Sequence, residues 1–210
     1  MKHNNQHYSS KFPDVNLKTF MVSETLRRHL YVFRTVTGVF SYKKIDLGTK
    51  ILIENMDIPK NPSTLLDLGC GYGAVGIVLA YESPQSVVYL IDINKRAIWC
   101  AKENLKLNLP EVKSRVNILW GNYFEPIKYK NIKFDSIYLN PPVRQGRKEF
   151  INLLYQIPNF LNPKGYFQFV IRKKMGASYI LSFLEKTFPD NKIEILCKRS
   201  GYWVFNYFQK

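Results

Sequence analysis

The chain has 210 residues, 46% of them hydrophobic, so it can bury the core of one ordinary domain and global disorder is not expected. Thirty-one Lys and Arg against sixteen Asp and Glu give a formal net charge of +15, which predicts a polyanionic partner such as RNA. No apolar stretch reaches the roughly 18 residues of a membrane span, and residues 1–10 lack the apolar segment of a secretory signal. Cys70, Cys100 and Cys197 are odd in number and far apart, which argues against a disulfide framework or a bound metal and favours a cytoplasmic protein.

The positive charge is concentrated in two flanks of the chain. Residues 143–210 carry twelve Lys and Arg against four Asp and Glu, and residues 1–45 carry eight against two. The middle of the chain is therefore nearly neutral. This distribution favours a binding surface over a solubility surface, which would spread the charge evenly and stays the alternative.

The first predicted elements lie before the regular alternation of strands and helices that begins at residue 64. Apolar side chains at Leu17, Phe20, Met21 and Leu26 predict a helix over residues 17–29. Aromatic and β-branched residues predict a strand at 29–35, which Gly38 ends. A second helix is predicted at 46–56, followed by a turn at 59–62 that contains two prolines.

From residue 64 strands and helices alternate. The predicted strands are 64–68, 87–91, 116–120, 134–139 and 166–171, and the predicted helices are 74–82, 95–108, 149–160 and 177–187. This alternation predicts a doubly wound α/β fold, in which a mainly parallel sheet is covered on both faces. Two closing strands, 192–198 and 202–208, flank Ser200 and Gly201 and add an antiparallel C-terminal edge, which makes seven strands. We expect a single domain, with a small N-terminal extension over 1–45 and the sheet domain over 46–210.

A glycine-rich turn follows the strand at 64–68. Gly69, Gly71 and Gly73 let the backbone bend sharply and approach a ligand closely at the carboxyl end of the strand. An NAD-binding Rossmann site uses the same logic and is the alternative. Asp67, inside the strand end, favours S-adenosylmethionine instead, because its carboxylate can meet the ammonium group of that cofactor.

Two further side chains follow the next strands. Asp92 and Ile93 come about 20 residues after the glycine turn, where a carboxylate can accept both ribose hydroxyls. Asp92 is alternatively the N-cap of the helix at 95–108. Asn122 ends the third strand, where its amide can hydrogen-bond the adenine edge or simply form a turn.

Asn140, Pro141 and Pro142 end the fourth strand and form the predicted reaction site. In isolation they are turn formers, which is the plain alternative. An exocyclic amine of a base is a poor nucleophile, because its lone pair is delocalised into the ring. The Asn140 side-chain carbonyl and the Pro141 backbone carbonyl can each accept one of its hydrogens, and so direct the nitrogen lone pair at an electrophilic methyl group. This needs positioning and no dedicated general base.

With these motifs the chain resembles the class I, Rossmann-like S-adenosylmethionine-dependent methyltransferases, specifically the small-domain family that includes rRNA guanine-N2 methyltransferases. The resemblance covers roughly residues 25–210 and is nearest to compact archaeal members. It implies that 46–210 is the methyltransferase domain, and residues 37–49 resemble the segment that precedes the catalytic core in this family. It also implies that Phe40, Asp46 and Gly48 lie over the cofactor or near its methionine end; core packing for Phe40 and helix capping for Asp46 are the alternatives.

The chain departs from the family at two positions. Many relatives have an aromatic residue after Asn-Pro-Pro that stacks on the flipped base, whereas this chain has Val143. A stacking ring must therefore come from elsewhere, and Phe40, Tyr42 and Tyr123 are the candidates. The family also usually has Asp where this chain has Asn122.

The predicted substrate is an amino group in RNA, most simply rRNA or a ribosomal subunit. Guanine N2 or cytosine N4 is the expected target; adenine N6, a protein glutamine amide and a non-catalytic RNA-binding module stay open as alternatives. The predicted RNA contacts are Val143, Arg144, Arg147, Lys148, Arg172, Lys173 and Lys174. A C5-type cytosine methyltransferase is disfavoured, because no cysteine lies between Cys100 and Cys197 to act as its nucleophile.

Overall fold

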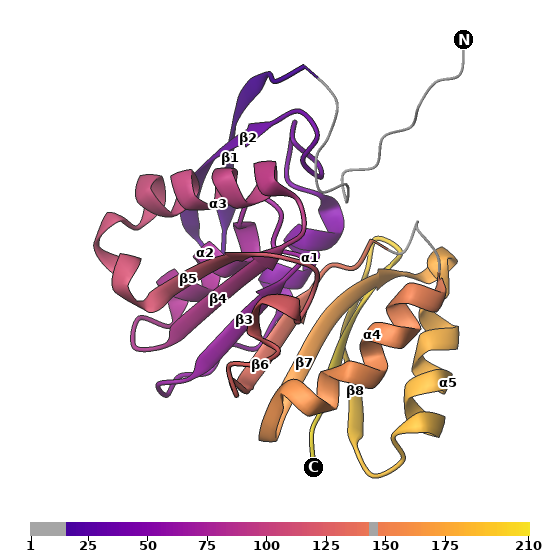
Figure 1. Ribbon diagram of the computed structural model, residues 1–210. Helices are drawn as coiled ribbons and strands as arrows, with labels where there is room; N and C mark the ends of the chain where they lie inside the picture. The colour runs from indigo at the N-terminus through magenta and orange to yellow at the C-terminus, as the bar shows by residue number, and fades with distance from the viewer. Residues whose placement is uncertain (1–15, 143–146) are drawn as a thin grey trace.

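The computed structural model describes residues 16–142 and 147–210, which form a two-stranded hairpin and a seven-stranded sheet with helices on both sides (Figure 1). The strands are β1 Thr19–Leu26, β2 His29–Val36, β3 Thr64–Leu68, β4 Val87–Asp92, β5 Val116–Trp120, β6 Phe134–Leu139, β7 Leu161–Arg172, β8 Lys192–Arg199 and β9 Tyr202–Phe208. The α-helices are α1 Leu47–Asn55, α2 Ala74–Glu82, α3 Lys95–Asn108, α4 Arg147–Phe160 and α5 Ala177–Thr187. Short 3-10 helices are η1 Pro110–Arg115, η2 Glu125–Ile127 and η4 Lys173–Met175.

The sheet has the strand order β5-β4-β3-β6-β7-β9-β8, with β9 antiparallel to both of its neighbours and the other neighbouring pairs parallel. This confirms the predicted doubly wound α/β fold with an antiparallel edge. The order reverses between β3 and β6, so the connections that follow these two strands leave toward opposite faces. In such sheets ligands bind at the carboxyl ends of the strands at this reversal.

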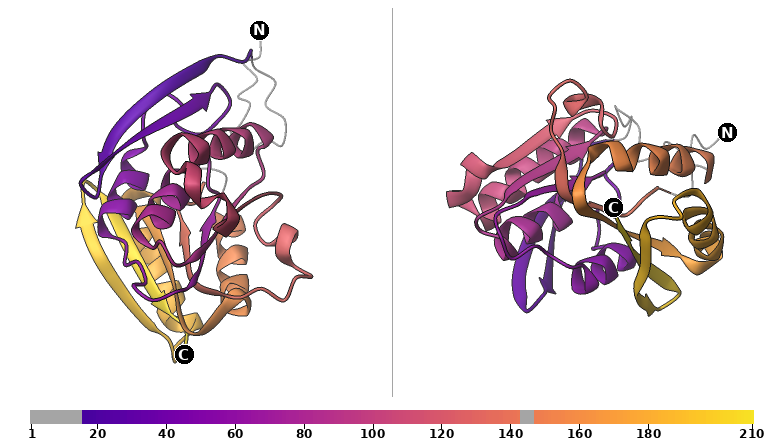
Figure 2. Two further views of the ribbon diagram at one scale, coloured as in Figure 1. Left: turned by 90° about the vertical axis from the view of Figure 1, so that its left-hand side faces the viewer. Right: turned by 90° about the horizontal axis from the view of Figure 1, so that it is seen from below.

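Helices cover both faces of the sheet, as the two views of Figure 2 show, and a buried hydrophobic core lies on each face. On one face α1, α2, α3 and the hairpin pack over side chains such as Leu65 and Val88. On the other face α4 and α5 pack over neighbouring positions such as Leu66 and Phe169. Successive strand residues thus face opposite cores, which is why the strands read as nearly continuous hydrophobic runs.

The predicted helix over 17–29 is wrong, because these residues form β1 and the turn into β2. The register pairs Leu26 with His29 across a two-residue turn, and Arg27 and Arg28 both have positive φ, as such turns require. Arginines are poor turn formers, so the sequence hides this turn. Tertiary contacts hold it, since Arg27 donates from its guanidinium to the Ile53 and Met56 carbonyls at the end of α1, 3.1 Å in each case.

The hairpin is tied to the sheet domain through α3. Asn104 accepts from the Arg34 backbone N–H and donates to the carbonyls of Arg34 and Tyr72, while Asn108 pairs with both backbone groups of Val32. The free edge of β2 is therefore satisfied by side-chain amides in place of another strand. Asn94, at the start of α3, donates to the Gly38 carbonyl at 2.7 Å and holds the loop that carries Phe40 near the glycine-rich turn.

The remaining predicted elements are present, with differences only at their ends. β7 begins at Leu161 and not at 166, but its regular pairing with β6 starts at Tyr166 after a register shift. The boundary predicted at residue 45 between extension and domain stays a prediction, and the hairpin shares one buried core with α1, α2 and α3. Among the described residues, none of the helices has the length and apolar character needed to cross a membrane.

Candidate active site

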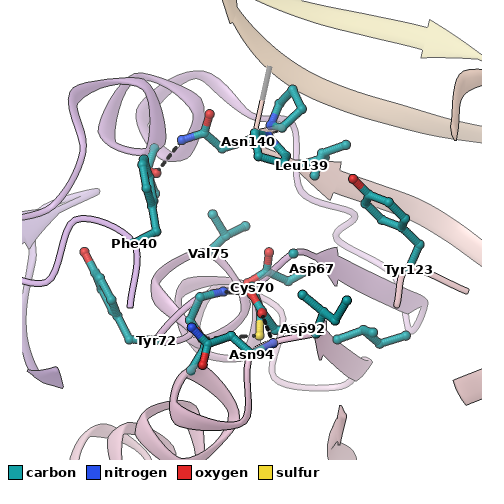
Figure 3. A pocket seen from close by; sticks show the side chains of 18 of the residues that line it. Phe40, Asp67, Cys70, Tyr72, Val75, Asp92, Asn94, Tyr123, Leu139 and Asn140 are labelled. Atoms are coloured by element: carbon teal, nitrogen blue, oxygen red, sulfur yellow. Dashed lines mark hydrogen bonds between the residues drawn. The ribbon is translucent and has the colours of Figure 1, made fainter. Parts of the chain in front are cut away.

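A pocket lies where the strand order reverses, and it is lined by most of the residues that the sequence pointed to (Figure 3). Asp67, Cys70, Asp92 and Asn94 form its lower part in this view, and Asn140 lies across from them. Phe40 and Tyr123 stand on opposite sides. The predicted site residues that line it are Phe40, Asp67, Gly69, Gly71, Asp92, Ile93, Asn122, Asn140, Pro141 and Pro142.

The glycine-rich turn adopts the conformations that only glycine takes without strain. Gly69, Gly71 and Gly73 have φ of 70°, 55° and 92°, and Gly73 is the N-cap of α2. The backbone N–H of Gly69 donates to the Ile91 carbonyl at 2.8 Å, so the turn is fixed to the end of β4. Gly73 does not line the pocket; a side chain there would meet Ala101 of α3, so this glycine serves close packing.

Asp67 is buried at the end of β3, and its Oδ2 accepts the Gly76 backbone N–H at 2.8 Å. Burial raises the pKa of this carboxyl from 3.8 to about 7, opposed by that hydrogen bond and reinforced by the nearby Asp92. A carboxylate in this position lacks a counter-charge among the hydrogen bonds that hold it. It fits a ligand that brings a cation, such as an ammonium group.

Asp92 connects the glycine-rich turn to the start of α3. Its Oδ2 accepts the Gly71 N–H and its Oδ1 accepts the Asn94 N–H, both at 2.8 Å. Burial raises its pKa, and the backbone hydrogen bonds oppose the rise. The alternative role as N-cap of α3 belongs instead to Asn94, which accepts from the Arg96 N–H. Asp92 keeps lone pairs for hydroxyl donors from a ligand.

Ile93 and Asn122 form the part of the pocket beside β5. Sequence reasoning missed the side chain that positions Ile93: the Trp120 indole N–H donates to its carbonyl at 2.8 Å. The signal for this contact in the sequence was a tryptophan at the last position of β5, two residues before Asn122, because its indole N–H needs an acceptor near the end of the neighbouring strand. Lys95 stacks on the same indole, with Nζ 4.4 Å from the ring centroid.

Asn140 is oriented by two groups from the start of α1. Its Nδ2 donates to Asp46 Oδ2 at 3.1 Å and to Thr49 Oγ1 at 2.8 Å. A carboxylate only accepts hydrogen bonds, so the side of the amide that faces Asp46 must be its NH₂ group. With both hydrogens used, the amide offers a ligand its carbonyl oxygen. The prolines that follow both line the pocket.

Asp46 and Gly48 do not line the pocket among its described residues, and the structure gives each another position. Asp46 is the N-cap of α1 and accepts from the Gly48 and Thr49 N–H groups. Gly48 packs beneath Tyr202, and a Cβ there would lie 2.8 Å from Cε1 of that ring. The capping alternative for Asp46 is confirmed; a direct role of either residue at the cofactor stays a prediction.

Of the three candidate stacking rings, Phe40 and Tyr123 line the pocket. Tyr42 is not among the described lining residues. The centroid of its ring lies 5.2 Å from that of Phe20 in β1. Sequence reasoning also missed Thr49 and Glu149 as lining residues. Thr49 and Glu149 come from the first turns of α1 and α4, so only the packing of these helices shows that they reach the site.

The predicted RNA contacts fall into three groups. Val143 and Arg144 lie outside the described residues. Arg147 and Lys148 are exposed at the start of α4, and Arg147 stacks on Tyr179 of α5 with Cζ 4.5 Å from the ring centroid. Arg172 is the last residue of β7, and Lys173 and Lys174 follow it, at the same edge of the sheet as the pocket. Among the described residues, no group of three His, Cys, Asp or Glu is arranged to hold a metal.

Comparison with known proteins supports this arrangement. A family model described as "Methyltransferase small domain" matches residues 30–206. The "Uncharacterized protein YbxB" of Bacillus subtilis is 32% identical over 199 residues, which covers 95% of this chain and 96% of that protein. The "Ribosomal RNA small subunit methyltransferase C" of Photorhabdus laumondii is 32% identical over 183 residues, covering 85% of this chain and 50% of that protein.

Among solved structures, the T. thermophilus 16S rRNA N2 G1207 methyltransferase (RsmC), in complex with AdoMet and guanosine, superposes with a TM-score of 0.73. It is 24% identical in sequence, and the match covers 94% of this chain and 52% of that one. At this identity the likeness shows the fold. The chain spans about half the length of the rRNA methyltransferase relatives it matches here.

Proposed function

The chain belongs to the methyltransferase small-domain family, whose members use S-adenosylmethionine, and we propose that it methylates an exocyclic amino group of a base in RNA. The observation that carries this proposal is the Asn140 amide. Asn140 lines the pocket, and Asp46 and Thr49 use both of its amide hydrogens, so its oxygen is the atom left to accept a hydrogen bond from a ligand. An oriented acceptor suits a substrate nitrogen that carries hydrogens.

The residues of the pocket fit the cofactor from one end to the other. The buried Asp67 carboxylate suits the ammonium group of the methionine part. Burial disfavours the ionised carboxylate and raises its pKa, and a nearby cation offsets that cost. Asp92 suits the ribose hydroxyls, and Ile93 and Asn122 suit the adenine ring and its edge. When bound, S-adenosylmethionine supplies an electrophilic methyl group on a sulfonium.

The reaction itself needs little from the protein beyond position. A carbon–nitrogen bond forms at the amine as the carbon–sulfur bond breaks, and the amine nitrogen loses one proton to solvent. The Asn140 oxygen accepts one amine hydrogen and the Pro141 carbonyl the other, which withdraws the lone pair from conjugation with the ring. The fixed φ of Pro141 and Pro142 limits the directions these carbonyls can take.

RNA is the proposed substrate because the relatives named as rRNA methyltransferases cover most of this chain and because the chain is strongly basic. Exposed Arg147, Lys148, Lys173 and Lys174 lie just beyond the strands that end at the pocket. A base in structured RNA has to leave its stack to enter a pocket of this kind. Phe40 and Tyr123, on opposite sides of the pocket, are the proposed stacking surfaces in place of the ring absent at position 143 (Figure 3).

Guanine N2 and cytosine N4 are the proposed targets, and Glu149 favours guanine N2. Glu149 lines the pocket from the first turn of α4. The Watson–Crick edge of guanine places a donor, N1–H, directly beside the amino group, and a carboxylate can accept it. Cytosine and adenine instead place an acceptor beside the amino group, which a carboxylate repels. The solved relative that was crystallised with guanosine is named for N2 methylation of G1207.

Nucleoside analysis tests the proposal. The purified protein, incubated with methyl-labelled S-adenosylmethionine and deproteinised rRNA or tRNA, should give N2-methylguanosine by mass spectrometry. N4-methylcytidine would keep the proposed reaction and reject guanine. Methylation of glutamine in a protein substrate, with none in RNA, would replace the proposal, and RNA binding without any transfer would indicate a non-catalytic module.

A further inference from the structure

The turn between β8 and β9 lies at the carboxyl edge of the sheet, the same edge as the pocket (Figure 1). Because β9 runs antiparallel to β7, its first residue, Tyr202, pairs with Arg172, the last residue of β7. The Lys173 N–H donates to the Gly201 carbonyl at 2.8 Å and fixes the turn to the segment that follows β7. Residues about 30 positions apart in the sequence thus share one edge.

This arrangement gathers five cations that the sequence separates. They are Arg172 at the end of β7, Lys173 and Lys174 just after it, and Lys198 and Arg199 at the end of β8. Lys173, Lys174, Lys198 and Arg199 are exposed and Arg172 is half-buried. The ion pairs found within residues 16–142 and 147–210 involve none of the five. Their charge is therefore available to a partner.

Two aromatic rings hold cations of this group in place. Arg172 Cζ lies 5.0 Å from the centroid of the Tyr202 ring, and Lys198 Nζ lies 4.3 Å from that of Trp203. A guanidinium that stacks on a ring keeps its edge donors free for a phosphate, and stacking reduces the freedom lost on binding. These contacts separate the group from lysines that merely extend into solvent.

A continuous path connects these cations to the pocket. The Tyr202 ring covers Gly48 in the first turn of α1, and the N-cap of that helix, Asp46, holds Asn140. Lys43 and Lys44, which are exposed, come just before Asp46 in the loop that carries Phe40. Cations are therefore present in the segment that leads into α1 as well as beside Tyr202, which packs on its first turn.

We infer that these residues form one phosphate-binding surface for the RNA strand that carries the target base. We name it the cationic arc: Lys43, Lys44, Arg172, Lys173, Lys174, Lys198 and Arg199. The inference rests on the proposed function and extends it, since the β8–β9 turn and the loop before α1 become RNA contacts. A nucleic acid carries one phosphate per nucleotide, so the strand on either side of an extruded base meets a row of cations that leads away from the pocket.

Salt dependence of RNA binding tests the arc without relying on methyl transfer. Fluorescence anisotropy with a labelled RNA stem-loop is measured over a range of KCl for the full chain and for the double variant Lys198→Gln/Arg199→Gln. The plot of log K against log [salt] has a negative slope, and the loss of two phosphate contacts should reduce its magnitude by about 1.5. Binding should weaken roughly 10- to 30-fold near 0.1 M salt. The matched control is Lys133→Gln/Lys186→Gln, which removes two exposed lysines at the opposite edge of the sheet.

The control variant should bind like the unaltered chain apart from a small loss from net charge. Equal slopes for the unaltered chain and for Lys198→Gln/Arg199→Gln, with unchanged melting temperatures, would overturn the arc, as would an equal loss in the control. The proposed function fails separately, when the unaltered chain binds S-adenosylmethionine yet methylates no RNA. The binding slopes decide the arc in either case.

Discussion

Asp46 and Asn140 lie 94 residues apart in the sequence and meet at the pocket, where Asp46 Oδ2 accepts the Asn140 Nδ2 hydrogen at 3.1 Å. The same oxygen caps α1 through the Gly48 and Thr49 N–H groups. The group that begins this helix is therefore also a group that fixes the orientation of the Asn140 amide. This coupling links the stability of α1 to the geometry of the reaction site.

Asn140→Ala should abolish methyl transfer and leave cofactor affinity within a few-fold. The substitution removes the acceptor that positions the amine, and loss of one preorganised group of this kind costs about 100-fold or more in kcat. Turnover is measured by transfer of a labelled methyl group, and cofactor binding by calorimetry. Asn152→Ala, an exposed asparagine on α4, is the control and should keep full turnover. Retained turnover in Asn140→Ala would refute its assigned role.

Thr49→Val should lower kcat by about 10-fold, because it removes one of the two acceptors that orient Asn140 and a neutral hydrogen bond is worth about 1.4 kcal/mol at most. The substitution keeps the shape of the side chain, and the Asp46 cap stays in place. Thr49→Ser retains the hydroxyl and should recover most of the rate. If valine and serine variants turn over equally fast, the Thr49 contact does not orient Asn140.

Cofactor affinity should increase as the pH rises through about 7, because Asp67 has its pKa raised to about 7 by burial and only its ionised form pairs with an ammonium group. Calorimetry with S-adenosylhomocysteine between about pH 6 and pH 8 measures this. Asp67→Asn should bind weakly and show no such rise. A flat profile for the unaltered chain would mean that Asp67 already carries its charge in the free protein.

The same pKa shift affects the stability of the cofactor-free protein in the opposite direction. The pKa of Asp67 is higher in the folded state, about 7, than its ordinary value of 3.8, so the folded state binds the proton more tightly. The contribution of Asp67 to stability is therefore present below about pH 4 and declines as the pH rises toward 7. Urea denaturation at several pH values should show this decline in the unaltered chain and its absence in Asp67→Asn.

Glu149→Gln should lower kcat/KM for guanine-containing RNA by roughly 10- to 100-fold, since the hydrogen bond from guanine N1–H loses its charged acceptor. Rates are measured by mass-spectrometric counting of N2-methylguanosine. Glu185→Gln makes the same charge change at an exposed position on α5 outside the pocket lining, and should have little effect. An unchanged rate in Glu149→Gln would remove the basis for preferring guanine.

The sequence by itself determined the sheet domain and the chemistry of its site. Parallel strands place their carboxyl ends at one edge of the sheet. Asp67 in β3, Asp92 at the end of β4 and Asn140 after β6 therefore had to converge there. Alternating strands and helices carry hydrophobic periods that local sequence encodes. The glycine-rich turn is equally local, since Gly69 and Gly71 adopt backbone angles that other residues avoid.

Only the tertiary structure decided which distant groups meet. The β1–β2 turn is held by contacts from Arg27 to the end of α1, which no local pattern of the sequence reveals. Asp46 and Thr49 orient Asn140 across the pocket, and the antiparallel strand β9 returns Lys198 and Arg199 to the edge where β7 ends. Hydrogen bonds and charges act over a few ångströms in space and not along the chain, so these relationships appear only once the sheet has formed.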